Sequence, residues 1–270
     1  MSLDLTPLIW FAFTLPILLL LQRWIHTHLH GLSLLLMGKP QRAVVLYAIV
    51  LLPGVILHEL SHWLAATFLG VRTGAFSVLP RTQADGTVQL GYVEYYKGRS
   101  LGPIRESLIG GAPLLSGTAV ILAISLRVFG VPSLTQAIQS GNIDELAIAF
   151  GELVNINDFF VWLYLLFAIS NAMMPSRSDR RAWPAFLLVM AVVAIALYAL
   201  GIQRVIFASL ANAAALVFSH LGLAFTMAIS VDLLFMLVIA ALEGVIGRFK
   251  GVNVVYGRPA SSVRKGKRSR

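Results

Sequence analysis

The sequence predicts an all-α polytopic membrane protein with about six transmembrane helices and a small β-hairpin at the cytoplasmic side. Composition is the first reason: of 270 residues, 58% are hydrophobic and 12% charged, and the mean hydropathy is +0.82. Such a chain is too apolar for a soluble globular protein. The second reason is that its apolar stretches approach the length of about 20 residues that crosses a bilayer as a helix. The third is that Lys and Arg gather in a few short segments between these stretches.

Six apolar stretches are expected to span the membrane as helices, because backbone polar groups in lipid need internal partners. They are Leu5–Leu21, Ala43–Leu69, Ser107–Phe129, Asp158–Met174, Trp183–Gly201 and Leu221–Val245. The first has no basic segment before it and no small-x-small cleavage site, so it is interpreted as a retained span. Leu32–Met37 is too short to span and is expected to be re-entrant or interfacial. Val205–His220 is also apolar but short, and a seventh span there would reverse the C-terminus.

Charge favours the six-span topology with both termini in the cytoplasm of a prokaryotic cell. The inside segments are then Gly70–Glu106, Pro175–Ala182 and Ile246–Arg270, which hold 16 of the 21 Lys and Arg residues. Residues 1–248 are expected to form one transmembrane domain, and residues 249–270 a basic, disordered tail against anionic headgroups. The net charge of +9 comes with no nucleic-acid-binding motif, so lipid and not nucleic acid is the expected partner.

The segment Gly74–Lys97 differs from the apolar stretches because polar and apolar residues alternate in it. Asp85-Gly86 separates two β-prone runs, which predicts a hairpin. In this topology the hairpin lies at the cytoplasmic surface, beside the end of the second span.

The second span carries His58-Glu59-Leu60-Ser61-His62, an HExxH motif. On a helix, residues four apart project from nearly the same face, so both imidazoles can share one zinc ion while Glu59 handles a proton of water. Ionisable residues inside a span are costly and are usually functional. The motif therefore predicts zinc-dependent hydrolysis inside the membrane.

A zinc site of this kind needs a third protein ligand, which must be a carboxylate or histidine because the chain has no cysteine. Asp179 is one candidate, because Pro175 ends the fourth span and can turn the chain back toward the second. Asp232, well inside the last span, is the competitor. Asp158 lies at the opposite membrane face in this topology and is a poorer candidate.

These features together resemble the site-2 protease family of intramembrane zinc metalloproteases. The resemblance covers roughly residues 43–179 and rests on HExxH in the second span and on Asn171 and Asp179, eight residues apart with a proline between. It implies His58, His62 and Asp179 as zinc ligands, Glu59 as the catalytic base and Asn171 near the developing oxyanion. The chain departs from the family pattern in placing Pro175 four residues after Asn171 instead of three, and Arg180 instead of Gly after Asp179.

The resemblance implies an intramembrane zinc metalloendopeptidase whose partner is a membrane protein with a transmembrane helix. A substrate helix must unwind before it is cut, and an edge of the hairpin is expected to hold it by strand addition through Val88, Leu90 and Val93. The alternative is a catalytically silent membrane scaffold or binding protein with the same fold. A third possibility is a membrane zinc hydrolase with a glutamate ligand, for which Glu152 is poorly placed.

Two further clusters receive lesser roles. Gly110, Gly111 and Pro113 in the third span resemble the family's Gly-Pro segment, and small residues there allow close packing on the HExxH helix. His26, His28 and His30 are expected in an interfacial loop on the outer side, with metal binding or pH sensing as the alternative.

Overall fold

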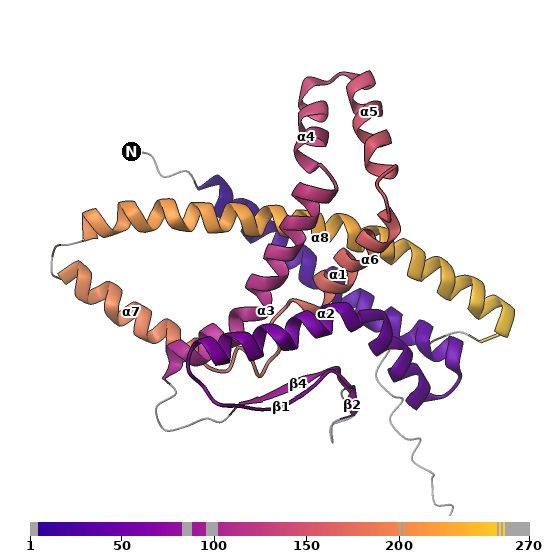
Figure 1. Cartoon of the computed structure of the whole chain (residues 1–270), viewed down its shortest axis with the longest axis horizontal. Helices are drawn as coiled ribbons and strands as arrows, with labels where there is room; N and C mark the ends of the chain where they lie inside the picture. Colours follow the sequence, from indigo (N-terminus) through magenta and orange to yellow (C-terminus); the bar gives the residue numbers. More distant parts are fainter. Residues whose placement is uncertain are drawn as a thin grey trace, which may run out of the picture.

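The computed structural model describes residues 5–82, 88–95, 102–199, 201, 203–252, 254 and 256. Helices dominate the described chain, and two short strand pairs follow the second helix (Figure 1). The elements are α1 (Thr6–Met37), α2 (Pro40–Phe68), β1 (Thr73–Ser77), β2 (Arg81–Thr82), β3 (Val88–Gln89), β4 (Tyr92–Tyr95), α3 (Pro103–Ala123), continued by a π-helical turn at Ile124–Val128, α4 (Val131–Ser140), α5 (Ile143–Val154), α6 (Phe159–Ala172), α7 (Trp183–Ala199) and α8 (Gln203–Lys250). The predicted mostly helical class is thus confirmed.

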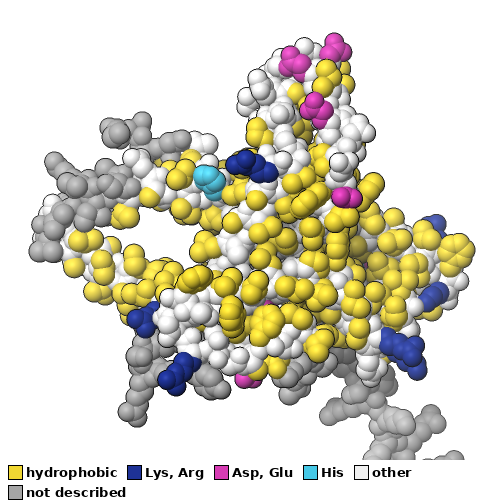
Figure 2. All heavy atoms as spheres, viewed as in Figure 1, with side chains coloured by type: hydrophobic (Ala, Val, Ile, Leu, Met, Phe, Trp, Pro, Cys, Tyr) yellow, Lys and Arg dark blue, Asp and Glu magenta, His cyan; other side chains and the backbone are white. Residues whose placement is uncertain are grey.

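The helices that surround the HExxH segment form the centre of the molecule. Helix α2 packs against α1, α3 and α6, while α1 and α8 run along one another across the whole structure (Figure 1). Their shared core includes Leu18, Leu51, Ile121, Phe167 and Phe225, all almost fully buried. Hydrophobic side chains also cover most of the visible outer surface (Figure 2), as expected where the surrounding solvent is lipid.

The prediction of six spans is not confirmed. Within the described residues, four helical segments are long and apolar enough to cross a membrane, or five if the bent pair α5 and α6 is one span. The four are Thr6–Met37, Pro40–Phe68, Pro103–Val128 and Leu210–Lys250. The span limits predicted from hydropathy differ from the observed helix limits. Hydropathy places the ends of spans at polar residues, whereas the helices continue through them.

The first helix shows this continuity most clearly, since α1 extends about 48 Å at 1.5 Å per residue. The predicted re-entrant segment Leu32–Met37 is its last turns. It ends at Gly38, whose left-handed φ of 67° lets its N–H bond the carbonyl of Leu34, and Pro40 then begins α2. The predicted interfacial loop at His26, His28 and His30 is likewise wrong, because all three residues lie inside α1.

Neighbouring helices satisfy the polar groups of these histidines, which explains why the helix does not end there. Nδ1 of His26 lies 2.6 Å from the hydroxyl of Tyr47, and Nδ1 of His28 lies 2.7 Å from Oε2 of Glu243. The His30 ring contacts the Tyr47 ring edge-on.

Residues 130–157, between the third and fourth predicted spans, contain the helices α4 and α5. They form a hairpin that projects from the bundle, with acidic side chains toward its end (Figures 1 and 2). The side-chain oxygen of Asn142 accepts a hydrogen bond from the backbone N–H of Asp144 and so caps the start of α5. Between α5 and α6 the chain bends by 83° near Asp158, which adopts a left-handed φ of 59°.

Helices α7 and α8 also differ from their predicted spans. Helix α7 has 17 residues and is therefore shorter than the other candidates. The apolar segment Val205–His220, considered above as a seventh span, is part of the single 48-residue helix α8. The orientation of the chain across the membrane stays a prediction, and residues 257–270 of the predicted tail lie outside the described residues.

The predicted hairpin consists of two antiparallel pairs. Strand β1 pairs with β4, with Phe76 opposite Val93, and β2 pairs with β3, with Thr82 opposite Val88. The predicted Asp85-Gly86 turn lies outside the described residues. Both β1 and β4 contact α2, so the strands lie along the helix that carries HExxH (Figure 1).

Candidate metal centre

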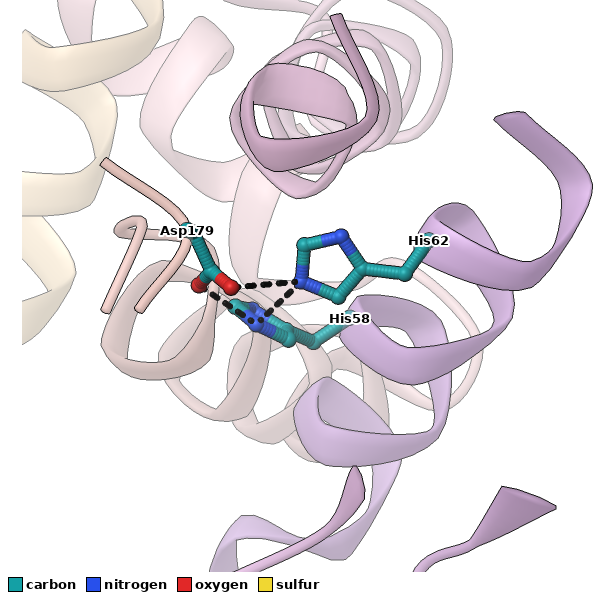
Figure 3. Close-up of side chains that lie close together, drawn as sticks. All are labelled: His58, His62 and Asp179. Carbon is teal, nitrogen blue, oxygen red and sulfur yellow. Dashed lines mark hydrogen bonds and ion pairs between the residues drawn. The ribbon is translucent and has the colours of Figure 1, made fainter. Parts of the chain in front are cut away.

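Helix α2 presents the two motif histidines side by side. His58 and His62 are one helical turn apart, and their rings meet edge-on with centroids 4.7 Å apart (Figure 3). The Nε2 atoms of the two rings are 3.1 Å apart. His62 is buried and His58 is partly buried. The predicted arrangement of two imidazoles on one helical face is confirmed.

Asp179 completes the group from the turn between α6 and α7. Its Oδ2 lies 3.6 Å from Nε2 of His58, and its Oδ1 lies 3.4 Å from Nε2 of His62 (Figure 3). A local turn fixes the carboxylate, because the N–H of Ser176 donates to Oδ2 at 2.7 Å and the N–H of Asp179 donates to Oγ of Ser176 at 3.3 Å. Pro175 stands at the start of this turn, as expected for a residue that ends a helix.

The spacing of the three side chains fits one metal ion. One ligand atom from each residue can be chosen so that all lie within 4.8 Å of one another. Tetrahedral zinc with ligand bonds of about 2.0–2.2 Å separates its ligand atoms by about 3.3–3.6 Å. The two Nε2 atoms lie 3.1 Å apart, close to one edge of such a tetrahedron, and the 3.4 and 3.6 Å separations run to different oxygens of Asp179, so the carboxylate faces both rings. His58, His62 and Asp179 can therefore hold a metal ion.

Hydrogen bonds on the far side of each ring orient both histidines toward this point. Nδ1 of His58 lies 2.6 Å from the carbonyl oxygen of Ala172 on α6, and Nδ1 of His62 lies 2.8 Å from that of Ile109 on α3. A carbonyl can only accept, so each Nδ1 carries the proton and each Nε2 keeps a lone pair for a metal. Three helices thus contribute to the orientation of the two rings.

Glycine permits the close contacts that bring Asp179 to the histidines. A Cβ at Gly110 would collide with the backbone carbonyl of Asp179, and it would lie 2.9 Å from the carbonyl carbon. A Cβ at Gly54 would similarly meet Ala168 on α6. Gly111 has nothing within 4 Å of its own Cβ position, so close packing involves only one member of the predicted glycine pair. Pro113 is buried within α3.

The charge of Asp179 is stabilised by the groups around it. Burial disfavours the ionised carboxyl, but the nearby side chains of His58 and His62, the positive charge that His62 carries when protonated, and the hydrogen bond with Ser176 outweigh burial. The pKa of Asp179 therefore lies well below its usual range, and the carboxylate is available as a ligand at neutral pH.

Glu59 lies beside the three potential ligands. It is buried and close enough to His58, His62 and Asp179 to interact electrostatically with all of them. The chain entering β4 covers it: a Cβ at Gly91 would lie 2.8 Å from Cγ and 2.9 Å from Oε1 of Glu59. Sequence reasoning missed Gly91, although a glycine within a strand-like run is a known signal for close approach.

The structure separates Asp232 and Asn171 from the group of potential ligands. Asp232 is fully buried on α8, and its Oδ1 accepts hydrogen bonds from Oγ of Ser170 at 2.9 Å and from Nδ2 of Asn171 at 2.8 Å. Asp179, not this competitor, joins the histidines. Nδ2 of Asn171 also contacts the Phe167 carbonyl at 3.0 Å, so the amide is engaged within α6 and α8. Its role near an oxyanion stays a prediction.

No protein-family model, curated protein or solved structure matches this chain. Function is therefore inferred from the geometry of the site. The three side chains of the site come from the HExxH helix and from a turn more than 100 residues later. Only the fold brings them together, inside a bundle of apolar helices.

The predicted strand residues lie near this site with different surroundings. Leu90 directly precedes Gly91 and packs on the hydrophobic core, and Val93 belongs to β4. Val88 belongs to the smaller pair formed by β2 and β3. Leu90 and Val93 thus flank the point where the chain touches Glu59.

Proposed function

We propose that this chain is an intramembrane zinc metalloendopeptidase that cuts peptide bonds in or near transmembrane segments of membrane proteins. The main support is one observation: two imidazole nitrogens and a carboxylate converge within metal-binding distance inside an apolar helix bundle, with a buried carboxyl beside them. Zinc is the expected ion because two imidazoles and one carboxylate are ligands typical of catalytic zinc.

Each residue of the site has a distinct task in this proposal. Zinc held by His58, His62 and Asp179 would supply Lewis-acid activation of water and of the scissile carbonyl. Glu59 accepts a proton from the attacking water and passes it to the leaving amine. Its burial keeps bulk water away from the carboxyl, while the Nδ1 bonds of the histidines hold the ligand geometry during the reaction.

The strands beside α2 are the proposed place of substrate capture. A helical substrate hides its scissile carbonyl and must lose several backbone hydrogen bonds in order to expose it. A strand can restore such bonds by pairing with the opened segment. Strand β4 supports this role because it follows directly on Gly91, the residue that contacts Glu59.

The proposed partners and location follow from the same chemistry. The substrate is a membrane protein with a transmembrane helix, reached through the lipid bilayer. We propose that both termini and the strands face the cytoplasm of a prokaryotic cell, because this orientation places 16 of 21 Lys and Arg residues inside.

The test uses Glu59→Gln, which keeps the size of the side chain but cannot accept a proton. With purified full-length protein in lipid and a membrane-spanning model substrate, this variant should bind zinc normally and lose cleavage. Glu152→Gln, an exposed carboxyl on α5, is the matched control and should cleave normally. Cleavage by Glu59→Gln would contradict the proposal. A wild-type protein that binds the substrate helix without cutting it would favour the scaffold alternative.

A further inference from the structure

The last turn of α6 is held by side chains from two other helices. An α-helix leaves its final carbonyls without partners inside the helix. In α6 the carbonyl of Ser170 accepts from Nε2 of Gln22 at 2.6 Å, and that of Ala172 accepts from Nδ1 of His58 at 2.6 Å. Two carbonyls at the end of α6 are thus held from outside, and His26 of α1 lies close to the backbone of Asn171 between them.

Asp232 holds the side chains of the same turn. Among described residues, its Oδ1 is bonded by Ser170 and Asn171, whereas its Oδ2 and Oδ1 of Asn171 are buried without hydrogen-bond partners. Both orphaned atoms are acceptors if Asp232 is ionised. One proton on Oδ2 of Asp232 makes it a donor, and the unsatisfied amide oxygen of Asn171 is an acceptor on a residue that already contacts Asp232. A neutral acid also avoids the cost of an unpaired charge at a fully buried position.

The last turn of α6 connects Asp232 to the metal centre. The carbonyl of Ala172 keeps Nδ1 of His58 protonated and so leaves Nε2 facing His62 and Asp179. A shift of Asn171 displaces the Ala172 carbonyl, because Ala172 is the next residue in the same helical turn. Loss of such an outer partner typically lowers metal affinity about 10- to 100-fold.

We propose that Asp232 is a positioning residue for the metal centre. As a neutral acid paired with Asn171, it fixes the last turn of α6, and this turn orients His58 through the Ala172 carbonyl. The inference rests on the metal-binding part of the proposed function. Asp232 would support the metal centre without being one of its ligands.

The experiment measures zinc affinity of the full-length protein in lipid nanodiscs by competition with a chelator. Asp232→Leu, of similar size and unable to hydrogen-bond, should bind zinc about tenfold more weakly or worse. Asp232→Asn should stay within about threefold of wild type, because its amide supplies both a donor and an acceptor, as a neutral acid does. Glu243→Leu removes a carboxyl from the same helix far from α6 and should bind zinc normally.

Two further readouts separate positioning from general damage. The visible spectrum of the cobalt-loaded protein reports ligand geometry and should change in Asp232→Leu but not in Glu243→Leu. Asn171→Leu should weaken binding by a similar factor, and the double variant with Asp232→Leu should add little, because both residues act through one contact. If Asp232→Leu does not fold, Ser170→Ala carries the test and should weaken zinc binding severalfold.

Several outcomes would overturn the inference. A folded Asp232→Leu protein, or in its place Ser170→Ala, with wild-type affinity and spectrum would exclude positioning. Loss of affinity in Asp232→Asn equal to that in Asp232→Leu would exclude the neutral acid. Failure of the wild-type protein to bind zinc would instead refute the proposed function, and the inference with it, so the two failures are distinguishable.

Discussion

Replacing Gly110 by alanine is a local test of how the metal centre is assembled. A new Cβ would collide with the backbone carbonyl oxygen of Asp179 and would lie 2.9 Å from its carbonyl carbon and 3.3 Å from its Cα. All three are backbone atoms, so no side-chain rotation can relieve the contact. The turn that carries the Asp179 carboxylate must move away from α3.

The size of this movement decides the effect. Ordinary contact with the carbonyl carbon begins at 3.4 Å, so the Asp179 backbone must withdraw by at least about 0.5 Å. Metal-ligand distances tolerate only about 0.2 Å. We therefore expect Gly110→Ala to lose the carboxylate ligand and to bind zinc at least about 100-fold more weakly, the upper end of what an outer-partner mutation costs. That is about 2.7 kcal/mol of binding free energy.

The neighbouring glycine supplies the control. Gly111→Ala makes the same change one residue along α3, where the added Cβ meets nothing within 4 Å. Both variants gain about 1 kcal/mol of helix propensity, so a difference between them cannot come from the helix itself. Zinc affinity by chelator competition and the thermal midpoint should be measured for both. Equal zinc affinity of Gly110→Ala and wild type would refute the proposed close contact between α3 and Asp179.

The remaining predictions address the ligand set, substrate capture and topology. Asp179→Ala should lose stoichiometric zinc while Asp144→Ala, an exposed acid, keeps it; retention by both would exclude the third ligand. Proline at Val93, within β4, should impair cleavage of a helical substrate but spare a short unfolded peptide, because proline removes a backbone donor from the strand. Equal loss on both substrates would mean general damage instead. Cysteine at Arg180 should be labelled from the cytoplasm and cysteine at Asp144 from outside, and the reverse would overturn the proposed orientation.

The pairing of the two histidines was predictable because it depends on local spacing. His62 is four residues after His58, which places both on one face once the segment is helical, and Pro175 indicated a turn near Asp179. The choice between Asp179 and Asp232 required the structure, since both are acids near apolar segments. Asp232 instead pairs with Ser170 and Asn171, which only the packing of α8 on α6 reveals.

The number and limits of the helices were less predictable for a physical reason. Hydropathy treats a polar residue as a boundary, but Gln22, His26 and His28 have partners on neighbouring helices and so remain inside α1. The sharp bend before α6 depends on the left-handed backbone of Asp158, a conformation that one sequence does not specify. The need for glycine at position 91 is likewise evident only from the fold, which places this residue against the side chain of Glu59.

The most direct test of the central claim is X-ray absorption at the zinc edge, measured on the purified, zinc-loaded full-length protein. We expect about one zinc per chain, nitrogen and oxygen neighbours at about 2.0–2.2 Å with an imidazole signature, and no sulfur at about 2.3 Å. The same spectrum should be lost in His58→Ala and in Asp179→Ala. A protein that takes up no stoichiometric zinc, or an unchanged spectrum in either variant, would contradict the metal centre described here.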